Sequence, residues 1–306
     1  MLGTVYKSTG SWYKVKLKNG EFVDCKLFGK FRTKNLKSTN PVCVGDNVVI
    51  KITENQTPQI EQINDRHNYL IRKSVKLSKQ YHIIASNIDL CFLIITIKNP
   101  ETSTMFIDRF LASTFSYNIE TVLLFNKIDQ IDNEEKKELN KLISIYKNAG
   151  YNCMEISGKK NINIDKLKKI MINKSCVFSG HSGVGKSTLI NKLDSRIDIK
   201  TSPISESNLS GQHTTTFSEM YDLNFNSRII DTPGIKGFGL YDVKNNELRD
   251  FFKEFTLVGN CKFNNCLHLE EPGCEVKIRV KKGDISKSRY DNYVELLSEI
   301  NNNYRH

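Results

Sequence analysis

The segment Gly180-His181-Ser182-Gly183-Val184-Gly185-Lys186-Ser187 has the form G-x-x-x-x-G-K-S. It follows Ser179 at the end of an apolar run of strand type, and a helical pattern over residues 186–193 begins inside it. Glycines in this context let backbone N–H groups surround phosphate oxygens. Lys186 can then reach the β and γ oxygens, and the Ser187 hydroxyl can ligate Mg²⁺. The segment predicts a phosphate-binding loop over residues 179–187 that takes Mg²⁺ together with a nucleotide.

A second motif, Asn126-Lys127-Ile128-Asp129, follows the apolar run of residues 122–125. A carboxylate at Asp129 can accept hydrogen bonds from both N1–H and the N2 amino group of guanine, a pair of donors that adenine lacks. Together with the phosphate loop, the motif predicts selectivity for GTP over ATP. Ser157 follows another strand pattern and fits the supporting guanine loop, although GTPases usually have alanine where Gly158 stands.

The segment Asp231-Thr232-Pro233-Gly234 follows a third apolar run. Asp231 can hold Mg²⁺ there, and the N–H of Gly234 can sense the γ-phosphate. Upstream, a polar loop over residues 201–216 ends in three threonines, and one of them would complete the Mg²⁺ shell in the GTP state. Spacing alone does not choose among residues 214–216.

The residue after Gly234 is Ile235, where many GTPases place a glutamine that orients the attacking water. An aliphatic side chain cannot do this, so the catalytic group must come from elsewhere. His213 is the candidate, because imidazole can orient or deprotonate water near neutral pH. The alternative is that His213 only shapes the switch loop. We expect slow intrinsic hydrolysis that a partner accelerates.

The order of the motifs is itself informative. Ordinary GTPases begin with the phosphate loop, whereas here Asn126 precedes Gly180, which precedes Asp231. The chain is therefore expected to be circularly permuted, which folds tolerate because their termini lie at the surface and often close together. In this order residues 231–239 run directly into the C-terminal region, so the backbone can transmit the nucleotide state to residues 240–306.

A separate set of candidate functional residues lies near the C-terminus, where Cys261, Cys266, His268 and Cys274 fall within 14 residues. Three thiolates and one imidazole suit tetrahedral Zn²⁺ in a closed structural site, and we expect one such ion. A cluster of free thiols is the alternative reading. The remaining cysteines sit singly in or beside apolar segments, as buried thiols do.

Periodicity places these motifs in three domains. Residues 1–66 contain five short strand patterns, typical of an OB-type β-barrel with an RNA-binding role. Residues 67–239 alternate strands and amphipathic helices, which predicts an α/β fold with a parallel sheet covered on both faces: a circularly permuted P-loop GTPase domain. Residues 240–306 are expected to form a mostly helical zinc-binding domain. The length of 306 residues alone would suggest two domains.

The formal net charge of +11 points to a polyanionic partner. Basic residues gather over residues 26–37, interleaved with Phe28 and Phe31, and again over residues 277–289. Both surfaces suit RNA phosphates, but the two phenylalanines could belong to the barrel core, and the second run could be a solvated helix face. The first residues lack a signal-peptide pattern, and the longest apolar run is residues 90–95. We expect a cytoplasmic protein without a membrane partner.

The three predicted domains, a barrel, a permuted GTPase domain and a zinc-binding domain, together resemble the family of ribosome small-subunit-dependent GTPases A (RsgA, also called YjeQ or YloQ) over nearly the whole chain. The most specific residues lie in Gly211-Gln212-His213-Thr214-Thr215, in residues 231–240 and in residues 261–274. The resemblance implies a GTPase that acts late in maturation of the small (30S) ribosomal subunit and is stimulated by that subunit. It also implies that Thr215 is the threonine that senses Mg²⁺. We expect a monomer that binds GTP, GDP and the rRNA of the small subunit.

Two functions remain open. In the first, GTP hydrolysis times release from immature small subunits. In the second, the protein is an RNA-binding assembly scaffold, and GTP only stabilises its binding conformation. The presence of Lys186, Ser187 and Asp231 favours the first. A permuted GTPase family that acts on the large subunit is a weaker third option, because the barrel and the cysteine cluster argue against it by resemblance.

Overall fold

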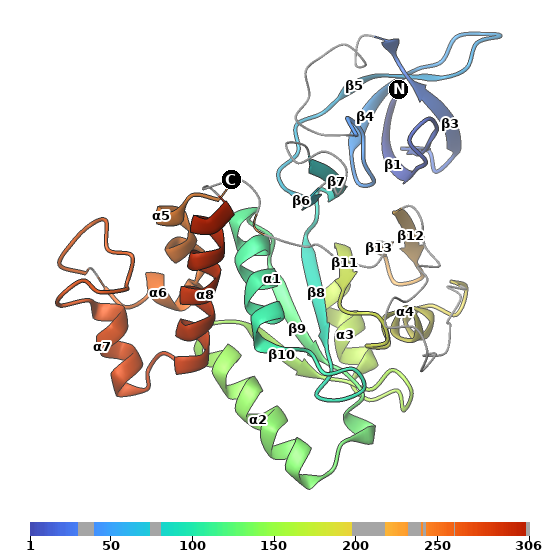
Figure 1. Ribbon diagram of the computed structural model, residues 1–306. Coiled ribbons are helices and arrows are strands. Elements are labelled where there is room, and N and C mark those ends of the chain that lie inside the picture. Colours follow the sequence, from blue (N-terminus) through green and yellow to red (C-terminus); the bar gives the residue numbers. More distant parts are fainter. Residues whose placement is uncertain are drawn as a thin grey trace.

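The computed structural model describes residues 1–29, 40–73, 81–197, 218–231, 240, 243–259 and 261–303. Its N-terminal part is a five-stranded barrel, as the strand patterns predict (Figure 1). The strands pair in the closed order β1-β2-β3-β5-β4-β1 around a core of alternating apolar residues that includes Val5, Val15 and Ile60. Their bounds are β1 Leu2–Ser8, β2 Tyr13–Leu17, β3 Phe22–Leu27, β4 Asn47–Lys51 and β5 Gln59–Ile63.

The central sheet contains five parallel strands in the order β10-β9-β8-β11-β13. They are β8 Leu90–Ile95, β9 Thr121–Phe125, β10 Asn152–Glu155, β11 Ser175–Ser179 and β13 Ser227–Asp231. Every residue of β8 is buried, because the side chains of this central strand alternate between two cores. α1 Thr104–Ser116 and α2 Asn133–Asn148 cover one face, and α3 Ile164–Met171 and α4 Lys186–Leu193 cover the other. The predicted α/β layering is confirmed.

Three strands escaped the sequence analysis. β6 Tyr69–Lys73 and β7 Tyr81–Ser86 form a two-stranded sheet between the barrel and the central sheet (Figure 1). β12 Glu219–Leu223 runs antiparallel to β13 and also pairs with β1 of the barrel at Lys7↔Glu219. The barrel and the central sheet therefore share one continuous hydrogen-bonded ladder.

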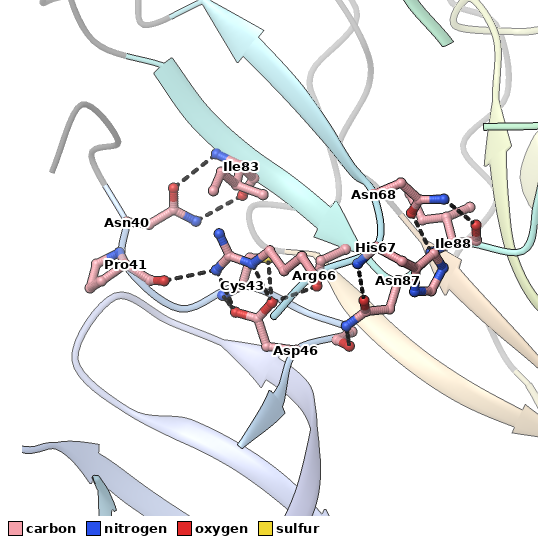
Figure 2. A network of polar contacts seen from close by, with 12 residues as sticks. Asn40, Pro41, Cys43, Asp46, Arg66, His67, Asn68, Ile83, Asn87 and Ile88 are labelled. Atoms are coloured by element: carbon pink, nitrogen blue, oxygen red, sulfur yellow. Dashed lines mark hydrogen bonds and ion pairs between the residues drawn. The ribbon is translucent and has the colours of Figure 1, made fainter. Parts of the chain in front are cut away.

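A buried aspartate also fastens the barrel to the strands that follow it (Figure 2). The carboxylate of Asp46 has no exposed surface and accepts from Nε and Nη2 of Arg66, each at 2.6 Å. It also accepts from the Ser86 hydroxyl at 2.6 Å and the Cys43 N–H at 2.9 Å. Arg66 precedes β6 and Ser86 ends β7, so this cluster joins the barrel to the β6–β7 sheet.

The C-terminal region is mostly helical, as predicted. Its helices are α5 Asn245–Leu248, η3 Arg249–Phe251, α6 Lys253–Thr256, α7 Glu275–Lys282 and α8 Lys287–Asn303. Their core contains Cys266 and Cys274, and Ala112 of α1 is buried in the same cluster. In the described residues, no helix is both long and apolar enough to cross a membrane.

Candidate functional site

The predicted motifs meet at one edge of the central sheet. β9, β10, β11 and β13 run parallel, so their carboxyl ends lie at the same edge. The guanine motif follows β9, Ser157 follows β10, the phosphate loop follows β11, and Asp231 is the last residue of β13. Open α/β sheets bind ligands at this edge, so parallel pairing alone assembles segments that lie far apart in the sequence.

Two glycines of the phosphate loop have no room for a side chain. Gly180 has a φ of +153°, and a Cβ there would lie 2.7 Å from the carbonyl oxygen of Ile94. Gly185 has a φ of +92°, and a Cβ there would lie 2.6 Å from Nδ2 of Asn126. α4 begins at Lys186, so the positive end of the helix dipole adjoins the loop. This geometry suits an anion held by backbone N–H groups.

The guanine motif also supports the phosphate loop, a contact that the sequence analysis missed. Nδ2 of the buried Asn126 donates to the Val184 carbonyl at 2.8 Å, and its Oδ1 accepts from the Gly158 N–H at 3.2 Å. Nζ of Lys127 donates to the Gly183 carbonyl at 2.7 Å. Partial burial lowers the pKa of Lys127. The side chains before Asp129 therefore link the phosphate loop to the loop around residue 158.

Asp129 is oriented by the supporting loop. Oγ of the buried Ser157 donates to Oδ1 of Asp129 at 2.5 Å and accepts from the Lys160 N–H at 2.9 Å. The glycine at position 158 is not a steric requirement, because an added Cβ would lie no closer than 3.5 Å to Leu189. GTPases usually have alanine at this position, and glycine supplies the same backbone N–H, which donates to Asn126.

Lys186 and Asp231 lie close together at the same edge. Nζ of Lys186 is 3.8 Å from Oδ1 of Asp231, whose side chain is 5% exposed. Ser187 is the next residue in the first turn of α4. A carboxylate and a hydroxyl beside a phosphate loop fit Mg²⁺, which takes few protein oxygens in addition to phosphate oxygens. Three further predicted site residues lie outside the described residues: His213, Thr215 and Gly234.

The remaining loop residues differ in their surroundings. Ser179 is fully buried, Val184 is buried in the core beneath the loop, and Ser182 is exposed. His181 is half-buried, and its ring stacks on Phe106 of α1 with ring centroids 3.8 Å apart. Burial lowers the pKa of His181, which favours the neutral form of the ring. Nothing in the sequence pattern indicated this contact.

The cysteine cluster converges as predicted. The ligand atoms of Cys261, Cys266, His268 and Cys274 all lie within 4.8 Å of one another. Nδ1 of His268 is 3.3 Å from Sγ of Cys274, 3.4 Å from Sγ of Cys266 and 3.6 Å from Sγ of Cys261. Tetrahedral Zn²⁺ bonded to sulfur at about 2.3 Å and to nitrogen at about 2.0 Å would separate these atoms by about 3.5 Å. The arrangement therefore fits Zn²⁺ with no ligand position left open.

Hydrogen bonds from α8 and from Glu271 position the backbone that carries the cluster. The Tyr290 hydroxyl donates to the His268 carbonyl at 2.7 Å, and the Tyr293 hydroxyl donates to the Leu267 carbonyl at 2.7 Å. The carboxylate of Glu271 accepts from the N–H of Leu267 at 2.6 Å. Contacts behind the ligands orient them and are as much part of such a site as the ligands themselves.

The basic run over residues 277–289 is only partly a surface, which corrects the sequence analysis. Arg289 is 2% exposed and lies between Glu254 and Asp108. Arg279 pairs with Glu275 and Asp284, Lys287 pairs with Asp291, and Nζ of Lys277 bonds a backbone carbonyl. In the described structure, only Lys281 and Lys282 of this run form neither an ion pair nor a side-chain hydrogen bond.

The first basic stretch falls mostly outside the described residues, which include positions 26–29 of it. Phe28 is 37% exposed and does not belong to the barrel core, so the core alternative is wrong for this residue. On the barrel surface, Nζ of Lys26 lies 4.6 Å from the ring centroid of Trp12, which is 44% exposed. A cation over an exposed ring suits stacking of bases beside phosphates.

Comparison with known proteins agrees with this geometry. The model of the RsgA GTPase family matches residues 63–241, and that of the RsgA N-terminal domain matches residues 2–60. A protein of Christiangramia forsetii named small ribosomal subunit biogenesis GTPase RsgA is 54% identical, covering 100% of this chain and 98% of its own length. The protein of the same name from Flavobacterium johnsoniae is 53% identical, covering 100% and 95%.

Two solved structures are similar over almost the whole chain. The crystal structure of YjeQ from Thermotoga maritima has a TM-score of 0.80 at 33% identity and covers 98% of both chains. That of YloQ, described as a circularly permuted GTPase, has a TM-score of 0.76 at 26% identity and covers 99% of this chain and 95% of its own. Matches to the barrel, to the permuted nucleotide-binding sheet and to full-length relatives agree, and the chain belongs to the RsgA GTPase family.

Proposed function

We propose that this protein hydrolyses GTP to GDP and phosphate, and that it acts in the biogenesis of the small ribosomal subunit. The observation that carries the GTPase part is the meeting of Asp129, Lys186 and Asp231 at one edge of the sheet. The names of full-length relatives at 53–54% identity support the ribosomal part. Late maturation of the 30S subunit, and stimulation by it, form the finer part of this proposal.

The site residues divide by role. Asn126 to Asp129 and Ser157 bind guanine, with the Asp129 carboxylate as the acceptor that excludes adenine. Residues 179–187 bind the phosphates, through backbone N–H groups and Nζ of Lys186. Ser187, Asp231 and Thr215 hold Mg²⁺, which neutralises charge on the β- and γ-phosphate oxygens when bound. Gly234 senses the γ-phosphate through its N–H.

Hydrolysis needs a group that orients water, and Ile235 cannot serve. We assign this role to His213, which lies in the segment between α4 and β12. Neutral imidazole can accept a proton from water. We expect slow intrinsic turnover that the bound small subunit accelerates.

The C-terminal cluster is proposed to hold one structural Zn²⁺. All four ligand positions are protein atoms, so the ion stabilises residues 240–306 and takes no part in the reaction. We propose that the barrel domain spans residues 1–66, the GTPase domain residues 67–239 and the zinc domain residues 240–306. The protein is proposed to be monomeric and cytoplasmic, with the barrel surface around Trp12 and Lys26 contacting rRNA.

The test is GTP turnover with and without purified small subunits, repeated over a salt series. We expect strong stimulation that weakens as salt rises, because phosphate contacts release counterions. Turnover that the subunit leaves unchanged would favour the assembly scaffold, and fast turnover by the isolated protein would contradict the role given to the subunit. Large subunits serve as the matched control.

A further inference from the structure

α1 lies between the phosphate loop and the C-terminal helices. Near its N-terminus, the ring of Phe106 stacks on the ring of His181, with centroids 3.8 Å apart and planes inclined by 33°. His181 directly follows Gly180, whose backbone is pressed against Ile94. The first two residues of the loop after β11 are therefore both held in place: Gly180 by the backbone of Ile94 and His181 by Phe106 of α1.

α1 also runs beside α8 (Figure 1), and two residues close to Phe106 in the sequence bond to that helix. Asp108 accepts from Nη1 of Arg289 and from Nδ2 of Asn292, both at 2.6 Å. Arg109 pairs with Glu299 at 2.6 Å. One turn of α1 thus contacts the phosphate loop on one side and the zinc domain on the other.

The contact with α8 is a closed polar cluster. Arg289 donates to both oxygens of Glu254, at 2.7 and 2.8 Å, and Tyr146 donates to Asp108 at 2.9 Å. Arg289 and Asp108 are almost fully buried. Burying such charges is costly unless every partner is in place, so displacement of one member leaves an unpaired charge. α1 and α8 are therefore expected to move as one body.

Aromatic stacking is suited to passing this constraint to the loop. The ring of His181 can keep contact with Phe106 only if the loop holds its position relative to α1. The backbone N–H groups of the next residues then point where the phosphates bind. Because contacts with α8 fix α1, residues outside the predicted nucleotide site also help to hold the loop in position.

We infer that His181 and Phe106 are positioning residues for the phosphate loop, and that they couple nucleotide binding to α8 through α1. The inference rests on the proposed function, since it takes a guanine nucleotide as the ligand of the loop. The coupling is reciprocal. Nucleotide binding favours the packed position of α8 against α1 by a certain factor, and packing of α8 raises the affinity for nucleotide by that same factor. It is separate from the backbone route through residues 231–240.

The first test is a double-mutant cycle on the full-length, zinc-loaded protein, with GDP as the probe. Phe106→Leu and His181→Ala are each expected to weaken GDP binding about three- to tenfold, the size of an aromatic pair. The double variant should be no weaker than the worse single one, because both remove the same contact. Phe106→Tyr should restore affinity, and Phe115→Leu, an aromatic change elsewhere on α1, is the matched control. The inference would be overturned if the two losses of GDP affinity multiply in the double variant, or if neither single variant loses affinity.

The second test measures amide hydrogen exchange of residues 287–303 with and without GDP. GDP should slow exchange in the unaltered protein and in Phe115→Leu, and the effect should shrink in Phe106→Leu, where the backbone route is intact. An equal response in Phe106→Leu would overturn the inference and leave the proposed function standing. Failure of the unaltered protein to bind GDP would overturn both.

Discussion

Replacing Asp46 by asparagine tests how the barrel is held to the nucleotide-binding sheet. Its carboxylate is fully buried and accepts five hydrogen bonds: two from Arg66, one from Ser86 and two from Cys43, through its N–H and its thiol. An amide of the same shape keeps one oxygen and presents an N–H₂ group to donors that already point at it. Arg66, whose side chain is 17% exposed, is left without its counter-charge.

The expected loss is about 3–5 kcal/mol of unfolding free energy, the usual result of breaking a buried ion pair from one side. Ser86→Ala removes one neutral donor to the same carboxylate and should cost about 1–2 kcal/mol. Asp24→Asn, at an exposed carboxylate of the barrel, is the matched control and should stay within about 0.5 kcal/mol.

Urea unfolding at neutral pH measures these differences, with barrel and GTPase signals followed separately. Asp46 joins two parts of the chain, so we expect the Asp46→Asn variant to lose coincidence of the two transitions. A loss below about 1 kcal/mol, with the transitions still coincident, would refute the reasoning: the β1–β12 pairing alone would then suffice to hold the barrel.

Four further outcomes are expected. Asp129→Asn should shift nucleotide preference from guanosine to xanthosine nucleotides, and unchanged GTP affinity would contradict the role of Asp129. Gly185→Ala should weaken GDP binding by at least about tenfold, because its Cβ would strike a side chain at a strained φ, whereas Gly158→Ala should bind normally. Chelation of zinc should unfold the C-terminal helices, seen as lost ellipticity that zinc restores; unchanged ellipticity would argue against a structural ion. The hydrogen-bonded Arg196 holds the pKa of Asp194 at about 2, below its unfolded value, but Arg196 is largely exposed to solvent, which screens the pair. About 1 kcal/mol of stability that is present above pH 4 should therefore disappear between pH 4 and 2. Asp194→Asn should abolish this dependence, and an unaltered acid midpoint in that variant would contradict it.

Elements with strong local patterns were predicted well. The phosphate loop requires a strand before it and a helix after it. In the structure β11 ends at Ser179, as predicted, and α4 has the predicted bounds of residues 186–193. β12 was missed because Glu219–Leu223 is short and mixes polar with apolar residues. What makes it a strand is pairing with β13 and with β1 of the barrel, which lies more than two hundred residues away in the chain.

Arg289 gives the sharpest contrast between sequence and tertiary structure. In the sequence it belongs to a basic run and looks like its neighbours, and charged residues are rarely buried. Burial depends on which face of α8 meets α1, and that is decided by Asp108 and Glu254 from distant segments. A local pattern cannot contain this information.

The sequence by itself predicted the candidate chemistry. It contains the patterns of a phosphate loop and a guanine motif, their permuted order, and a cluster of three cysteines and one histidine that could hold a metal ion. Only the tertiary structure decided how these parts support one another. Asn126 bonds to the phosphate loop, His181 stacks on Phe106, and Arg289 is buried against α1. The physical reason is that a motif needs only its own backbone geometry, whereas burial and pairing depend on which surfaces meet when the whole chain packs.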